Sequence, residues 1–159
     1  MEPIAKIKDA KIIDIIKVVL ENILLELYFN IEYLNEKLSF KLSISDDGET
    51  ILFSLNEKWI ALEDINYEAY SAVKVNKGKD ELSNLLGNEI LNIQFGIGKT
   101  LDTHKEVIYY IKINTNKNEF LFFNNGDEGA YSFDKIGAIL DNDIYGYEWS
   151  FYPPLEQIK

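Results

Sequence analysis

The sequence predicts an α+β fold, in which a buried N-terminal helix packs on a mainly antiparallel β-meander sheet with one or two short additional helices. Three observations predict it. Polar residues recur at helical spacing in residues 9–26, apolar and polar residues alternate in residues 38–45, and polar turn sequences separate the later apolar runs. The length of 159 residues fits a single globular domain, 1–159, with a weak subdivision near 76–80 as the alternative.

The helix prediction for residues 9–26 depends on a narrow polar stripe. Asp14, Lys17 and Glu21 are spaced as on one helix face, and apolar side chains cover most of the rest. A helix that is apolar around most of its circumference is buried on more than one side. Many of these residues are β-branched, which argues against a helix, but we give the polar spacing more weight. Residues 28–34 fit either a continued helix or a strand, and their aromatic side chains favour the strand.

Strands joined by tight turns are expected in the rest of the chain. Residues 38–45 alternate strictly, Asp47 and Gly48 predict a hairpin turn, and residues 50–55 form the returning strand. Short helices are expected after Asp80, which would be the N-cap, and over residues 134–140. The same signals predict further strands at 59–62, 72–75, 90–95, 107–113, 119–123 and 147–152, and a loop at 96–105.

The net charge of the chain limits the classes of partner that it can bind. It has 27 acidic residues, 16 lysines and no arginine, so the formal net charge is −11. Such a chain is repelled by nucleic acid and by anionic membranes, which argues against both as partners and favours a basic protein partner or simple solubility.

The chain also has no cysteine, which excludes disulfides and thiol chemistry. No secretory signal and no membrane-spanning run is recognisable, so we expect a cytoplasmic protein. We also expect no cofactor.

Two short motifs resemble ligand-binding loops but lack required residues. Residues 96–100 end like a phosphate-binding loop, yet Ile93 stands where its first glycine is needed, so we expect a glycine-rich connection between strands. Residues 141–146 begin like a calcium loop, but Tyr145 and Tyr152 stand at ligand positions. The only histidine, His104, has no nucleophile motif beside it. We therefore assign no catalytic residue and no metal site.

The strongest functional signal is an acidic segment that is rich in aromatic residues. Residues 119–156 contain eight acidic side chains, one lysine and ten aromatics. Tyrosine and tryptophan are favoured at the centres of interfaces, and surrounding charge steers a basic partner. The alternative is an ordinary strand pattern, with aromatics in the core and acids in water. The candidate partner-binding residues are Asp141, Asp143, Tyr145, Tyr147, Glu148 and Trp149, together with the turn residues Asp127 and Glu128.

In size, acidity and clustering of acids with aromatics, the chain resembles small acidic bacterial immunity proteins, which neutralise basic toxins by binding them. The resemblance implies a non-catalytic module that binds a basic protein. Two other functions stay open. Any of the 27 acids could converge in a small carboxylate- or metal-dependent enzyme, or carboxylates spaced like phosphates could make a nucleic-acid-mimicking inhibitor. An exposed aromatic patch would also fit a homodimer interface.

Overall fold

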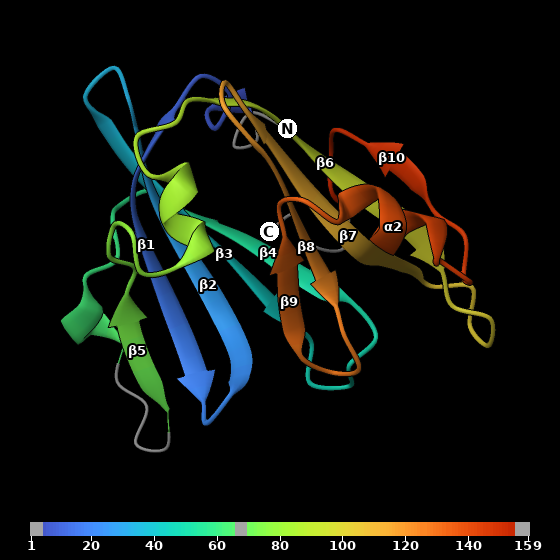
Figure 1. Cartoon of the computed structure of the whole chain (residues 1–159). Helices are drawn as coiled ribbons and strands as arrows, with labels where there is room; N and C mark the ends of the chain where they lie inside the picture. Colours follow the sequence, from blue (N-terminus) through green and yellow to red (C-terminus); the bar gives the residue numbers. More distant parts are fainter. Residues whose placement is uncertain (1–4, 66–69, 155–159) are drawn as a thin grey trace.

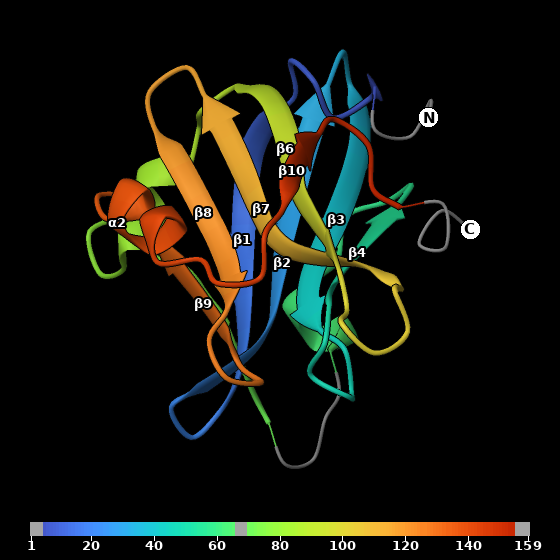
Figure 2. The same ribbon diagram turned by 90° about the vertical axis from the view of Figure 1, so that its right-hand side faces the viewer.

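A computed structural model describes residues 5–65 and 70–154 of the chain. It is 51% strand and 10% helix, and its antiparallel sheet curls into a half-barrel, as Figures 1 and 2 show. The prediction of an α+β fold with an N-terminal helix on a sheet is therefore wrong. The α-helix that falls wholly within the described residues is α2 (Ile136–Asp141), which follows β9 late in the chain.

All strand pairs are antiparallel, and the hydrogen-bonded path runs β10-β6-β7-β8-β9-β2-β1-β5, with β3 and β4 branching from β2. The strands are β1 (Lys11–Leu20), β2 (Ile23–Tyr33), β3 (Glu36–Ile44), β4 (Ile51–Asn56), β5 (Ser71–Lys74), β6 (Ile90–Lys99), β7 (Glu106–Thr115), β8 (Glu119–Asn124), β9 (Gly129–Ser132) and β10 (Glu148–Ser150). Two 3-10 helices cover Leu62–Asp64 and Glu81–Leu85. Strands β2 and β9 pair only at Leu24 and Gly129, so the first five strands and the last five fold toward each other.

The region predicted as a helix forms β1 and the start of β2. Both faces of β1 are covered, which gives a strand the nearly continuous apolar pattern of a buried helix. Ile12 and Ile15 enter the main core, whereas Ile16 and Val18 pack with Tyr28 in a smaller cluster on the other face. The ambiguous residues 28–34 belong mostly to β2, so the choice of strand is confirmed.

The second prediction that fails is the strand at 59–62. This segment lies across the outer face of β2 instead of pairing with it edge to edge. Trp59 Nε1 donates to the Ile31 carbonyl oxygen at 2.7 Å, and the buried Asn30 side chain bonds both the amide and the carbonyl of Ile60. The segment therefore covers the first group of strands, and it ends in the 3-10 helix Leu62–Asp64.

Several element boundaries also differ from those expected. Four of the ten residues of the predicted loop at 96–105 are strand, because β6 extends to Lys99. The helix after Asp80 is a 3-10 helix, Glu81–Leu85, and Asp80 caps it as predicted by accepting from the amide of Leu82 at 2.9 Å. Strand β9 was not predicted, and the last strand is shorter than expected.

Aromatic side chains from both groups of strands meet in the main core. Phe29 of β2 stacks on Phe40 of β3, with ring centroids 4.7 Å apart, and meets Phe120 of β8 edge-on at 6.0 Å. Phe53 of β4 meets Phe95 of β6 edge-on at 5.3 Å. This packing fixes the inner faces of the half-barrel, which leaves the outer face of β6, β7 and β10 for other contacts.

Candidate functional site

The segment that carries most of the predicted interface residues crosses the outer face of the half-barrel between α2 and β10. The carboxylate of Asp143 holds this segment against the sheet. Asp143 Oδ1 accepts a hydrogen bond from the Tyr110 hydroxyl at 2.6 Å, and its Oδ2 accepts from the Gly146 amide at 2.7 Å. Residues 143–147, called the 143–147 loop below, are thus closed on themselves and fastened to β7.

Aromatic rings from the loop pair with rings from β7. Tyr145 stacks on Tyr109 with centroids 5.3 Å apart and an interplanar angle of 21°. Tyr147 meets Tyr110 edge-on at 4.8 Å, and Trp149 meets Tyr147 edge-on at 5.3 Å. Offset and edge-on pairs of this kind are the favoured arrangements of aromatic rings. Tyr109 and Tyr110, on which the predicted aromatics Tyr145 and Tyr147 pack, were not predicted from the sequence.

Neighbouring residues of a strand normally point to opposite faces, yet Tyr109 and Tyr110 both contact the loop. The register explains this, because Tyr110 is opposite Gly96 whereas Ile108 is opposite Ile97, which leaves Tyr109 as an extra residue in β7. Such a β-bulge redirects a side chain. No pattern in the strand sequence itself marks the bulge, so it could not have been found from the residues of β7.

Glycine at two positions of β6 makes room for this layer. A β-carbon at Gly98 would collide with the Tyr109 ring and with the carbonyl oxygen of Gly146. A β-carbon at Gly96 would lie 3.0 Å from Tyr110. The glycine-rich motif therefore has a packing role, since the missing side chains let the loop approach the sheet closely.

The environment of the site raises the pKa of three of its tyrosines. Burial, the hydrogen bond to Asp143 and the charge of Asp143 all raise the pKa of Tyr110. Burial also raises the pKa of Tyr109, with further contributions from Tyr145, Asp143 and Glu49. The pKa of Tyr147 is raised by burial and then by the charges of Asp143 and Asp141. The negative charge of Asp143 thus acts on all three of these tyrosines.

The eight predicted residues are only partly brought together. Asp141, Asp143, Tyr145, Tyr147 and Trp149 lie on one face. Glu148 lies between Tyr147 and Trp149 in β10, and alternation along the strand turns its side chain to the opposite face.

Asp127 and Glu128 lie on the turn between β8 and β9, outside this face. The β3–β4 turn stands between that turn and the 143–147 loop. On one side of this turn, the side chain of Asn124 donates to the Gly48 carbonyl oxygen at 2.6 Å. On the other side, the charge of Glu49 contributes to raising the pKa of Tyr109. For this reason we include Glu49 in the site, although it was not predicted from the sequence.

We define the acidic aromatic surface as Glu49, Tyr109, Tyr110, Asp141, Asp143, Ile144, Tyr145, Tyr147 and Trp149. Its members differ in exposure. Ile144 and Tyr145 are 82% and 62% exposed, whereas Trp149 is half-buried, with the Lys112 ammonium 5.6 Å from its ring centre. Tyr145 is thus the aromatic most available to a partner, and Trp149 supports the layer beneath.

Within residues 5–65 and 70–154, no three side chains of histidine, cysteine, aspartate or glutamate are grouped so that they could hold a metal ion.

Helices in the same ranges are all too short or too polar to cross a membrane.

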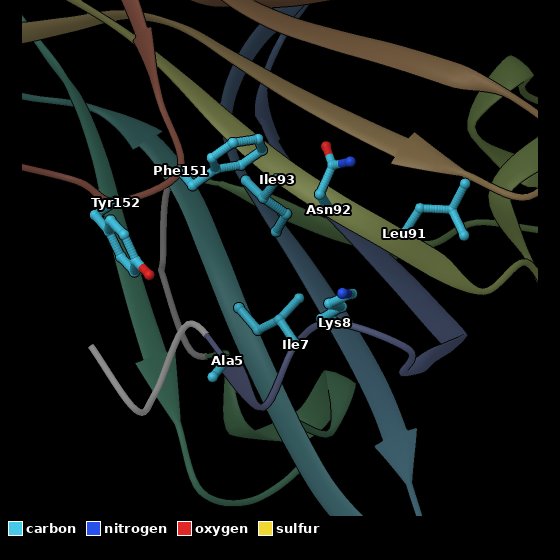
Figure 3. Close-up of a pocket in the computed structure, with 8 residues that line it drawn as sticks. All are labelled: Ala5, Ile7, Lys8, Leu91, Asn92, Ile93, Phe151 and Tyr152. Carbon is cyan, nitrogen blue, oxygen red and sulfur yellow. The ribbon is translucent and has the colours of Figure 1, made fainter.

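A concavity lies away from the acidic aromatic surface, beside the first half of β6 (Figure 3). Its volume is about 390 Å³, and Ile7 and Ile93 of the main core form part of its wall. Leu91, Phe151 and Tyr152 line it from more exposed positions. It includes none of the predicted site residues, and none of the described residues that line it carries a carboxylate.

Comparison of this chain with protein-family models, with curated proteins and with solved structures finds no match, so the assignment of function depends on the geometry above.

Proposed function

We propose that this chain is a non-catalytic protein-binding module that holds a basic protein partner through the acidic aromatic surface. One observation carries the proposal. Tyr145 is exposed, yet it stacks on Tyr109 and belongs to a loop that Asp143 closes by two hydrogen bonds. An exposed aromatic that is already held in place loses little conformational entropy on binding, which favours affinity.

The charge around this aromatic supports a basic partner. Asp141 and Glu49 are exposed, and neither forms an ion pair with another residue in the described ranges. Uncompensated surface carboxylates attract cations and speed association, and the net charge of −11 acts in the same direction. A partner with lysine and arginine around its contact area would satisfy these carboxylates.

The setting we propose follows the resemblance to small acidic bacterial immunity proteins, with a basic toxin as one example of such a partner. A cytoplasmic location is also part of this proposal and depends on the sequence alone. Fractionation of cells that express the tagged chain would test it.

The binding proposal is tested by capture at two salt concentrations. We expect the immobilised chain to retain a basic protein from a lysate of its source at low salt and to release it at high salt. The double variant Asp141→Asn/Glu49→Gln should capture much less, because it removes two carboxylates of the surface. The matched control Glu57→Gln/Glu63→Gln makes the same change in net charge elsewhere and should capture as the unmodified chain does. Equal capture by both variants would contradict the assignment of the surface, and no capture by any form would reject the proposal.

A further inference from the structure

The 143–147 loop ends in an unusually exposed apolar apex. Ile144 is 82% exposed and Tyr145 62%, whereas Asp143 and Tyr147 on either side are half-buried. Large apolar side chains this exposed and adjacent are a common feature of the parts of a protein that insert into another.

The apex is also held rigidly. The carboxylate of Asp143 binds the Tyr110 hydroxyl and the Gly146 amide, and its own amide donates to the Leu140 carbonyl oxygen at 3.2 Å. The close approach that Gly98 allows fixes the height of the loop above β6. A loop that is fixed before binding presents its apex in one conformation.

From this geometry, and resting on the proposed function, we propose that the apex Ile144–Tyr145 inserts into a concave apolar pocket of the partner whose rim carries lysine and arginine. The carboxylates near the apex determine which kind of partner pocket can bind it. Insertion brings Asp141 and Glu49 to the rim, and burying carboxylates without cations costs more than the apolar contact gains. A flat apolar partner or a second copy of this chain would leave them unpaired, and the charge of −11 repels a second copy.

Asp143 is a positioning residue in this proposal, because both of its side-chain oxygens are used within the chain. Its charge and its role as a clamp can be separated. Tyr110→Phe removes one hydrogen bond of the clamp without changing the charge, and Asp141→Asn changes the charge without touching the clamp. We expect Tyr110→Phe to raise the dissociation rate from the captured partner about tenfold while the association rate stays the same. Asp141→Asn should lower mainly the association rate and its dependence on salt.

Insertion itself is tested by photo-crosslinking with the full chain. The photoreactive residue p-benzoylphenylalanine replaces Tyr145 in one form and Leu34 in the control, because Leu34 is 81% exposed on the distant β2–β3 turn. During capture from the lysate, we expect an adduct with the retained protein from position 145 and none from position 34. The adduct should map to an apolar pocket bordered by lysine or arginine. In the same assay, Ile144→Ser should weaken binding at least about 30-fold, and Leu34→Ser should not change it.

Each other outcome overturns the proposal in a distinguishable way. Capture without an adduct at 145 would reject insertion and leave the proposed function standing. An adduct between two copies of the chain would assign the apex to a homodimer. An adduct on a flat or acidic surface of the partner would reject the cation-rimmed pocket. Absence of any captured protein would reject the proposed function and this inference with it.

Discussion

The ammonium nitrogen of Lys17 in β1 lies 2.7 Å from Asp80 Oδ2, in a wedge between β1 and β9, which are both neighbours of β2. The other oxygen of Asp80 accepts from the Tyr131 hydroxyl of β9 at 3.0 Å and from the Leu82 amide at 2.9 Å. One carboxylate thus connects β1, β9 and the 3-10 helix Glu81–Leu85. The Lys17 ammonium also donates to the Tyr131 hydroxyl at 3.3 Å, and a cavity of about 470 Å³ lies beside these contacts.

The first prediction concerns the stability that Asp80 supplies. Asp80→Ala removes a helix cap, worth about 1 kcal/mol, a hydrogen bond to Tyr131 of similar size, and an ion pair of about 0–1 kcal/mol because both groups are partly exposed. We expect a loss of about 2–3 kcal/mol in the free energy of unfolding, measured by urea denaturation. Glu81→Ala is the control, since Glu81 is exposed. A loss below about 0.5 kcal/mol for Asp80→Ala would show that the carboxylate does not hold the wedge.

The second prediction is the pH dependence of the same contact. Burial alone would raise the pKa of Asp80, but the hydrogen bonds from Lys17 and Leu82 outweigh it, and the pKa lies below its ordinary value of 3.8. Because the folded-state pKa is lowered, the contribution to stability is complete above pH 3.8 and is lost as the pH falls through the folded-state value. The difference in unfolding free energy between the unmodified chain and Asp80→Asn should therefore be constant from pH 7 to 5 and shrink below pH 3.8. A difference that stays constant down to pH 2.5 would contradict this linkage.

How much of the fold the sequence predicts depends on what covers each strand. In β3 the apolar residues Leu38 and Phe40 enter the main core, whereas the other face carries Ser39 and Ser43, which are also buried. The alternation of residue type was therefore visible, and the strand β3 is confirmed. Strand β1 is covered on both faces, and its polar residues are placed by long-range ion pairs. Asp14 pairs with Lys74 of β5 at 3.2 Å, and Lys17 pairs with Asp80. Their helical spacing is thus set by distant partners, which no local pattern reveals.

The same reasoning applies to the candidate site. The composition of residues 141–149 was enough to place Tyr145, Tyr147 and Trp149 together. Their supports, Tyr109 and Tyr110, could not be predicted, because both reach the outer face only through a bulge that the register of β6 and β7 creates. Glu148 was included by proximity in sequence, and a strand assignment for β10 turns it away.

The third prediction tests the close approach of the loop to β6. Gly98→Ala places a β-carbon against the Tyr109 ring and the backbone of Gly146, so we expect a loss of about 1–3 kcal/mol in stability and a displaced 143–147 loop. Gly137→Ala is the matched control. Its β-carbon meets nothing within 4 Å in the helix α2, and alanine there should stabilise by about 0.4–1 kcal/mol. Urea denaturation gives both values, and amide chemical shifts of residues 143–147 report the displacement. Equal behaviour of the two variants would mean that Gly98 is not needed for packing.

The last prediction concerns the hydroxyl group that Asp143 holds. Burial and the hydrogen bond to Asp143 raise the pKa of Tyr110, so its neutral form is favoured in the folded chain. This contribution to stability is complete below the ordinary tyrosine pKa of 10.0 and is lost as the pH rises through the folded-state value. Asp143→Asn should lower the pKa of Tyr110, because it removes the charge and weakens the hydrogen bond. The stability advantage of the unmodified chain over this variant should accordingly shrink above pH 10.

Titration of ¹³C-labelled tyrosine rings by NMR measures this directly. Tyr131 is the internal control, since burial raises its pKa in the wedge and its charged contacts are Lys17 and Asp80. We expect Asp143→Asn to move the titration of Tyr110 to lower pH and to leave that of Tyr131 unchanged. If Tyr110 titrates at the same pH in both proteins, Asp143 does not hold its hydroxyl, and the rigid presentation of Ile144 and Tyr145 loses its physical basis.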